Sequence, residues 1–239
     1  ASDWGGGGVE GVSFTAADLL GITPTGQIHV LWGKRFVLSQ EHLREARELL
    51  HWMKAFRVEL IAHDYTGAAT LRETFLRHNK VPLEKIIPIA YVRAASKGIM
   101  THKMATDIHP RSHYILDKTR SLLHVCAAIK MRQILFFKHD YVDSEDPGLI
   151  NDFLGLSENK TPTARGSDIY TIQRHALLSD DFAQAVNIGA CTIWHTTRKW
   201  PQLGIGAGPL TSEQMRAAAL SADDDWLEEP EYEGYADQP

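Results

Sequence analysis

Cysteine and long apolar runs are scarce in this chain, and each shortage excludes a class of protein. Its 239 residues include only two cysteines, Cys126 and Cys191, which give neither a disulfide framework nor the spacing of a metal site. No apolar run approaches the roughly 20 residues that a membrane-spanning helix needs. The Gly-x-x-x-x-Gly-Lys-Ser/Thr of phosphate-binding loops and the Gly-x-Ser-x-Gly of acyl hydrolases are also missing from the sequence. We therefore expect a protein of a reducing compartment, with no membrane role, no ATPase motor and no acyl-hydrolase site.

Acidic charge is concentrated at the C-terminal end. Residues 1–197 carry 22 Lys and Arg against 21 Asp and Glu, whereas residues 198–239 carry 3 against 9. A strongly negative segment with few apolar side chains buries too little surface to fold alone. We predict one folded domain over residues 1–198 and an acidic, flexible tail over residues 199–239.

Basic side chains are dense in residues 93–138, where nine Lys and Arg face two acidic residues. Such a stretch is suited to following the phosphates of a nucleic acid. The alternative is an ordinary solvated helix face, which remains open for each side chain taken singly. The candidates for DNA contact are Arg93, Lys97, Lys103, Arg111 and Lys118.

Hydrophobic periodicity predicts alternating strands and helices. We expect a first strand ending at Asp3, strands at 11–20, 27–36, 58–62, 86–92, 134–137 and 169–173, and helices at 39–53, 67–76, 116–131, 148–156 and 180–196. The first three strands would form an antiparallel ribbon with a turn at Pro24-Thr-Gly. Three strands, a helix, a strand, a helix, a strand and a helix is the order of the ribonuclease H-like fold. The expected fold class is therefore α/β, with a central mixed sheet flanked by helices.

Four aspartates stand at positions from which the chain could aim them at one point. Asp3 ends the first strand, Asp64 follows a short apolar strand, and Asp180 and Asp181 open an apolar helix. Ligands of α/β sheets gather outside the carboxyl ends of the strands, and Mg²⁺ and Mn²⁺ prefer carboxylate oxygens. The pattern predicts a nuclease with two divalent metal ions, because a pair of ions needs several carboxylates. Each aspartate alone could instead be a helix cap or a turn residue.

Three short motifs carry a resemblance to a known family. Asp3-Trp-Gly-Gly-Gly-Gly, Ile61-Ala-His-Asp-Tyr-Thr-Gly and Ser179-Asp-Asp-Phe-Ala occur in this order. Over roughly residues 1–197 the chain resembles the nuclease domain of the large terminase subunit of tailed bacteriophages. The resemblance implies an endonuclease that cuts concatemeric double-stranded viral DNA with two Mg²⁺ or Mn²⁺ ions. Asp3 would be shared by both ions, Asp64 would bind one, and Asp181 is favoured over Asp180 as the ligand from the helix.

The same resemblance implies partners and a location. Family members carry an ATPase motor on the N-terminal side of the nuclease, and this sequence begins without a Met at a first strand, so we expect a piece of a longer chain. Double-stranded DNA, the motor, the portal protein and the small terminase subunit are the expected partners. The place of action would be the viral packaging machinery in the cytoplasm of a bacterial host.

Three alternatives stay open. The chain could be a resolvase or transposase-like nuclease of the same fold, which differs in its substrate. It could also be a catalytically silent nucleic-acid-binding module with an incomplete acidic cluster. His109 and His113 have the spacing of a helical zinc pair, although Pro110 lies between them and no third ligand is evident.

Overall fold

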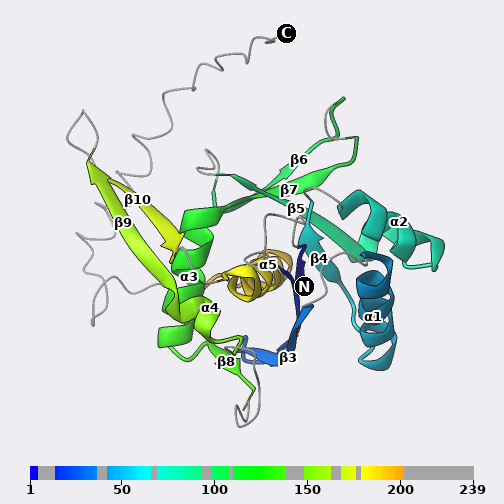
Figure 1. Cartoon of the computed structure of the whole chain (residues 1–239), viewed down its shortest axis with the longest axis horizontal. Coiled ribbons are helices and arrows are strands. Elements are labelled where there is room, and N and C mark those ends of the chain that lie inside the picture. The colour runs from blue at the N-terminus through cyan, green and yellow to red at the C-terminus, as the bar shows by residue number, and fades with distance from the viewer. Residues whose placement is uncertain are drawn as a thin grey trace. The chain divides into compact units, whose positions relative to one another are not determined.

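The chain folds as an α/β unit built on one large sheet. The computed structural model describes residues 1–4, 14–36, 42–65, 69–92, 98–107, 110–137, 148–162, 168–175 and 179–201, which all lie in one compact unit, Ala1–Pro201 (Figure 1). An eight-stranded mixed sheet is flanked by helices, and a two-stranded sheet stands apart from it. The predicted α/β class and the mixed sheet flanked by helices are confirmed.

The large sheet has the strand order β6-β7-β5-β4-β1-β2-β3-β8. Its strands are β1 (Ser2–Asp3), β2 (Thr15–Ile22), β3 (Ile28–Phe36), β4 (Ile61–Asp64), β5 (Ile86–Val92), β6 (Met100–Lys103), β7 (His113–Asp117) and β8 (Ile134–Phe136). Strands β1, β2 and β3 form an antiparallel ribbon, as predicted, and β1, β4, β5 and β7 run parallel. Strand β1 therefore lies at the junction of the two halves, beside β4, and the carboxyl ends of these two strands point the same way.

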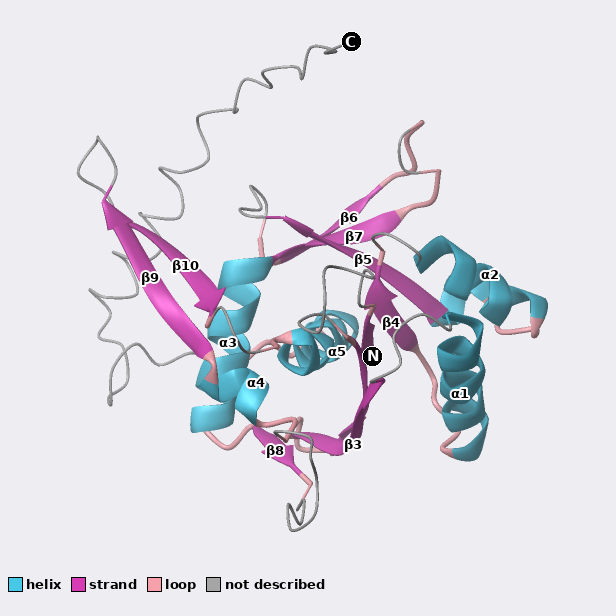
Figure 2. Ribbon diagram, viewed as in Figure 1, coloured by secondary structure: helices cyan, strands magenta, loops and turns pink. Residues whose placement is uncertain are grey.

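Helices cover both faces of this sheet, as Figure 2 shows. They are α1 (His42–Ala55), α2 (Ala69–His78), α3 (Lys118–Lys130), α4 (Asn151–Leu154) and α5 (Asp181–Thr197), with a short 3₁₀ turn, η1 (Leu83–Lys85), before β5. Side chains alternate between the faces of a strand, so Ala16 packs on the α5 side and Ala17 on the α1 and α2 side. Each face thus has its own apolar core.

Helix α5 is the centre of the first core. It packs against β1, β2, β3 and β4 and is buried on nearly all sides, from Phe182 to Trp194. A helix that is apolar all round is typical of the interior, which explains why its sequence lacks a polar face. Gly189 allows close approach, because a Cβ there would lie 2.4 Å from Leu20 Cδ1. The N-terminus of α5 is thereby held near the ends of β1 and β4.

Several predicted elements were wrong in extent. Strands β6 and β7 were not predicted, and the helix predicted from Leu116 begins at Lys118. Asp117 ends β7 and caps α3, since its side chain accepts a hydrogen bond from the Arg120 amide at 2.9 Å. The strand predicted at 58–62 is Ile61–Asp64, because residues 58–60 are partly or fully exposed.

The segment from 148 to 175 also differs from its prediction. The helix predicted at 148–156 is the single turn α4, and the strand β9 (Leu156–Pro162) follows it and pairs with β10 (Asp168–Arg174). The β9-β10 hairpin packs through β10 against α3. The strand predicted at 169–173 is confirmed within β10.

Some predictions fall outside the described residues. These include the glycines of the Asp3-Trp-Gly-Gly-Gly-Gly motif, the first residues of the helix predicted at 39–53 and the tail from residue 202 onward. The boundary predicted at 198–199 therefore stays a prediction. No described helix has the length and apolarity needed to cross a membrane.

Candidate functional site

Three elements bring four aspartates to one pocket. Asp3 ends β1 and Asp64 ends the parallel strand β4, and the pairing of Ser2 with His63 places the two aspartates side by side on one face. Asp180 and Asp181 stand at the N-terminus of α5. All four line a pocket of about 380 Å³. Residues from opposite ends of the sequence meet here because α5 packs on the strands that carry the other two.

The remaining pocket walls come from five elements or loops. They are Trp4, Tyr91 of β5, Lys118 of α3, Ile172 and Arg174 of β10, and Gln184 of α5. Four of these side chains, Tyr91, Lys118, Arg174 and Gln184, are polar groups that could contact a charged ligand, and two of the four are cations. The pocket therefore combines an acidic floor with basic side chains at its edge.

The carboxylates repel one another. Burial raises the pKa of Asp3 well above its usual range, and the charges of Asp64, Asp181 and Asp180 raise it further. Burial also raises the pKa of Asp181, while hydrogen bonds from Phe14 and Ser179 lower it. A group of acids crowded in this way favours a bound cation, which would offset the repulsion.

The two aspartates of α5 are held by hydrogen bonds. Asp181 Oδ2 accepts from the Phe14 amide and from the Ser179 hydroxyl, each at 2.7 Å. Asp180 Oδ2 accepts from Gln184 Nε2 at 2.8 Å. These bonds fix both carboxylates at the N-terminus of α5 and leave some of their oxygen lone pairs available to a ligand.

Two basic side chains approach the pocket on the side of Asp180. Lys118 Nζ lies 3.6 Å from Asp180 Oδ2, and Arg174 Nη1 lies 3.9 Å from Asp180 Oδ1. The Lys118 ammonium also lies 5.6 Å from the centre of the Tyr91 ring. Both cations are partly exposed, so they can exchange a weak contact with Asp180 for a phosphate.

The donor set fits hard divalent cations. Within the described ranges, no three His, Cys, Asp or Glu side chains are already arranged as ligands of one ion. The chemistry nevertheless suits Mg²⁺ or Mn²⁺, because every candidate ligand is an oxygen. Gln184 adds an amide oxygen, Oε1, that is buried and has no hydrogen-bond partner among the described residues.

A buried ion pair supports the start of α5. Asp152 Oδ2 accepts from the Phe182 amide at 2.8 Å, and Asp152 Oδ1 accepts from Arg35 Nη2 at 2.5 Å. Burial raises the pKa of Asp152 to about 6, although Arg35 and the Phe182 amide lower it. Asp152 therefore ties α4 and β3 to the helix turn that presents Asp180 and Asp181.

The five residues predicted to bind DNA have different positions. Lys118 lines the pocket, and Lys103 is exposed at the end of β6. Arg111 pairs with Glu73 and donates to the Ile86 carbonyl at 2.8 Å, so its guanidinium is engaged within the fold. Arg93 and Lys97 lie outside the described residues.

The histidine pair considered for zinc is not seen as a helical pair. His113 is buried on a strand, β7, where its ring stacks on Tyr65 with a centroid distance of 5.4 Å. His109 lies outside the described residues. A spacing of four residues points to a zinc pair only on a helix, where it brings both side chains to one face. His113 lies on a strand, so the spacing from His109 does not indicate a zinc site.

The sequence analysis missed Tyr91, Arg174 and Asp152. Tyr91 stands near the carboxyl end of β5, which is parallel to β4, so the rule applied to Asp64 would have indicated it. Arg174 ends a strand shortly before Asp180, which is a weaker signal. Asp152 gave no signal, because its role depends on the packing of α4 against α5.

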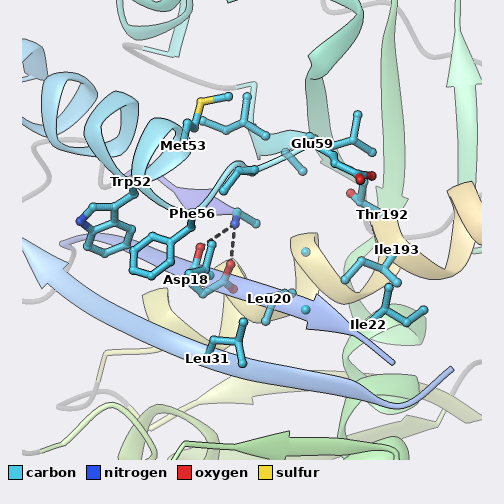
Figure 3. A pocket seen from close by; sticks show the side chains of 18 of the residues that line it. Asp18, Leu20, Ile22, Leu31, Trp52, Met53, Phe56, Glu59, Thr192 and Ile193 are labelled. Atoms are coloured by element: carbon cyan, nitrogen blue, oxygen red, sulfur yellow. Dashed lines mark hydrogen bonds and ion pairs between the residues drawn. The ribbon is translucent and has the colours of Figure 1, made fainter. Parts of the chain in front are cut away.

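A second pocket, of about 480 Å³, lies on another part of the sheet (Figure 3). Its walls are mostly apolar and include Leu20, Leu31, Met53, Phe56 and Ile193. The buried Asp18 carboxylate at its base is paired with the amino group of Ala1 at 2.5 Å. The pocket is larger than the acidic one, but its lining is mostly apolar and its buried carboxylate, Asp18, is already paired, so it is the weaker candidate.

Comparisons with known proteins leave the acidic pocket as the basis for a functional assignment. No protein-family model, curated protein or solved structure matches this chain. Four aspartates from β1, β4 and α5, flanked by Lys118 and Arg174, are the arrangement that any proposed function must explain.

Proposed function

We propose that this chain is a divalent-metal-dependent DNA endonuclease with a ribonuclease H-like fold, related to the nuclease domain of large terminase subunits. The convergence of Asp3, Asp64, Asp180 and Asp181 on one pocket carries the proposal. Asp3 and Asp181 are separated by more than half of the chain. Four acids gathered without a bound cation would destabilise the fold through charge repulsion, so a gathering without function is a poor explanation.

The sheet topology supports the same proposal. An antiparallel ribbon, β1 to β3, is followed by parallel strands β4 and β5, with β1 beside β4. The order of elements up to β5 is that expected of a ribonuclease H-like fold. Asp3 then lies near Asp64 on β4 and Asp181 on α5, from where its carboxylate could share a ligand with each of them.

The pocket residues would divide the chemistry between them. When bound, two Mg²⁺ or Mn²⁺ ions would activate a water for attack on phosphorus and stabilise the departing 3′ oxygen. Asp3 would be shared by both ions, Asp64 would hold one from β4, and Asp181 would hold the other, with Asp180 as an alternate ligand. Lys118 and Arg174 would contact the phosphate that enters, since both cations face the acidic floor. No protein nucleophile is required.

The biological setting is proposed on the motifs alone. The substrate would be concatemeric double-stranded viral DNA, cut during genome packaging in the cytoplasm of a bacterial host. An ATPase motor on the N-terminal side of the nuclease, the portal protein and the small terminase subunit would be the partners.

Conversion of supercoiled plasmid to nicked and linear forms tests the proposal. We would compare the wild type with Asp64→Ala and Asp181→Ala in Mg²⁺, Mn²⁺, Ca²⁺ or EDTA. Asp107→Ala is the matched control, because Asp107 is exposed and lies outside the pocket. Cutting that needs Mg²⁺ or Mn²⁺, survives in the control and is lost in both pocket variants is expected. No cutting with any metal would overturn the nuclease, and preferential cutting of branched junctions would favour a resolvase.

A further inference from the structure

Trp4 and His63 are the immediate neighbours of two pocket aspartates. Trp4 follows Asp3, and His63 precedes Asp64. Because side chains alternate along a strand, Asp3 and Asp64 face α5 while the other two face α1 and α2. Trp4 accordingly packs in the core of that second face, against residues such as Leu76.

The two rings are joined by a buried hydrogen bond. Trp4 Nε1 donates to His63 Nδ1 at 3.1 Å, and their exposed fractions are 4% and 1%. His63 Nε2 lies 3.5 Å from a Glu73 carboxylate oxygen, which favours a proton on Nε2 and leaves Nδ1 as the acceptor. The Asp64 carbonyl oxygen lies 2.8 Å from the same Nδ1, but in this tautomer both atoms are acceptors and make no hydrogen bond to each other.

Each ring has a second anchor in α2. The Arg72 guanidinium carbon lies 4.3 Å from the centre of the Trp4 ring, and Arg72 is itself fully buried and bonded to Glu45 at 2.6 Å. Glu73, beside His63, is paired with Arg111. The linked rings are therefore fixed to the body of the protein rather than only to each other.

Backbone pairing holds Asp3 beside Ala16 of β2, but it gives little direct control over the separation of Asp3 from Asp64. Strand β1 has only two residues, and its pairing with β4 consists of one register pair, Ser2 with His63. Ligand groups must be held within about 0.5 Å of their working geometry, and this usually requires contacts from a surrounding shell of side chains. The bond from Trp4 to His63 is a side-chain contact that joins the ends of β1 and β4.

We propose that Trp4 and His63 are positioning residues of the acidic pocket: their hydrogen bond sets the separation of Asp3 and Asp64 and so the affinity for divalent metal. This inference rests on the proposed function, and it assigns to Trp4 and His63 the positioning of two of the metal ligands. Interactions of this kind around metal ligands commonly change affinity by about 10- to 100-fold.

The test uses four single variants and the Trp4→Phe/His63→Leu double variant, with Mn²⁺ as the probe. Trp4→Phe keeps an aromatic ring at this position and removes the N–H donor of the indole. His63→Leu removes the Nδ1 acceptor. His63→Asn places an amide oxygen near the position of Nδ1 and is the conservative rescue. Leu76→Ala is the matched control, because Leu76 is fully buried in the same core and bonds to neither ring. Mn²⁺ affinity would be measured by calorimetry, together with kcat and KM for plasmid nicking and Tm.

We expect Trp4→Phe and His63→Leu each to weaken Mn²⁺ binding by about 10-fold or more, with a lower kcat and an unchanged KM for DNA. The double variant should be no worse than either single one, since both remove the same bond. His63→Asn should recover much of the Mn²⁺ affinity. Leu76→Ala should lower Tm and leave the Mn²⁺ affinity unchanged.

Two failures are distinguishable. A wild type that binds Mn²⁺ and cuts DNA, with Trp4→Phe and His63→Leu variants that bind Mn²⁺ equally well, would overturn this inference and leave the proposed function standing. A wild type that neither binds Mn²⁺ nor cuts DNA would overturn both.

Discussion

Lys118 and Lys103 are alike in the sequence and differ in their surroundings. Lys118 Nζ approaches Asp180 at 3.6 Å in the acidic pocket, whereas Lys103 is exposed at the end of β6 and is not among the lining residues. A charge-assisted contact to a phosphate is worth roughly 1.5–3 kcal/mol, about 10- to 100-fold in rate. We expect Lys118→Ala to slow plasmid cutting by at least about 10-fold and Lys103→Ala to change it much less. Equal rates for the two variants, measured at one Mn²⁺ concentration, would contradict this assignment.

Asp152 gives a prediction about pH. Its carboxyl is 3% exposed, and burial raises its pKa to about 6, above that of the unfolded chain. The folded state therefore holds this proton more tightly, so the group's contribution is fully present below about pH 4 and is lost as the pH rises through 6. Relative to Asp152→Asn, the wild type should lose about 2 kcal/mol of unfolding free energy between pH 4 and pH 7. Urea unfolding of both proteins across this range measures the difference, and parallel curves would show that Asp152 titrates normally.

The sequence indicated the aspartates better than the basic residues. Asp64 and Asp181 occupy the end of a strand and the start of a helix, and such positions follow from periodicity. Arg111 belongs to the same basic run as Lys118, yet it bonds to carbonyl oxygens before β5. A run of positive charge does not distinguish a side chain used by the fold from one that faces a ligand, because that difference depends on long-range packing.

At the scale of elements, the contact between β3 and α5 is unusually close. A Cβ on Gly33 would lie 2.4 Å from Phe182 Cε2 and 2.9 Å from Leu149 Cδ1. Phe182 is buried and follows Asp181, so an added methyl group must displace the Phe182 ring at the start of α5. We expect Gly33→Ala to cost about 1–3 kcal/mol of stability and to weaken Mn²⁺ binding.

Gly21→Ala is the control for that prediction. It lies in the neighbouring strand, and its added Cβ would meet only Leu31, a half-exposed side chain, at 3.1 Å. Chemical denaturation and calorimetry with Mn²⁺ should separate the two variants. Similar losses in both would mean that the approach of β3 to α5 does not position Asp181.

Elements with a strong apolar signal were predicted and polar ones were missed. Strand β5 has the predicted bounds, and α5 differs from its prediction by one residue at each end. Strand β6 is mostly polar and β7 has only three apolar residues in a row, Tyr114 to Leu116, so neither gives a strong apolar signal. Leu116 then continued a helical pattern into α3, although it is buried in β7. Pairing between strands, which no local pattern contains, decided these segments.

At the scale of the whole molecule, the acidic pocket opposes the stability of the fold. Asp3, Asp64, Asp180 and Asp181 are brought together by the same packing of α5 on β1 and β4 that builds the core. Folding therefore has to overcome their repulsion, and Arg72 and Lys118 offset part of it, since both act on this group of charges. Binding sites that are strained in this way commonly gain stability when a charge is removed, at the cost of function.

Asp3→Asn tests this balance directly. The pKa of Asp3 is raised by burial first and by Asp64 and Asp181 next, so at neutral pH the folded state disfavours its charge and a neutral amide of the same shape should raise Tm without metal. The wild type should instead gain stability from Mn²⁺, by about 2.7 kcal/mol at 100 times the dissociation constant, and the variant should gain little. Thermal unfolding with and without Mn²⁺ measures both effects, and Asp107→Asn, at an exposed site, should show neither change in the metal response nor higher Tm. A variant less stable than the wild type without metal would show that Asp3 is a structural residue, because only a carboxylate that serves the fold would be missed before any cation binds.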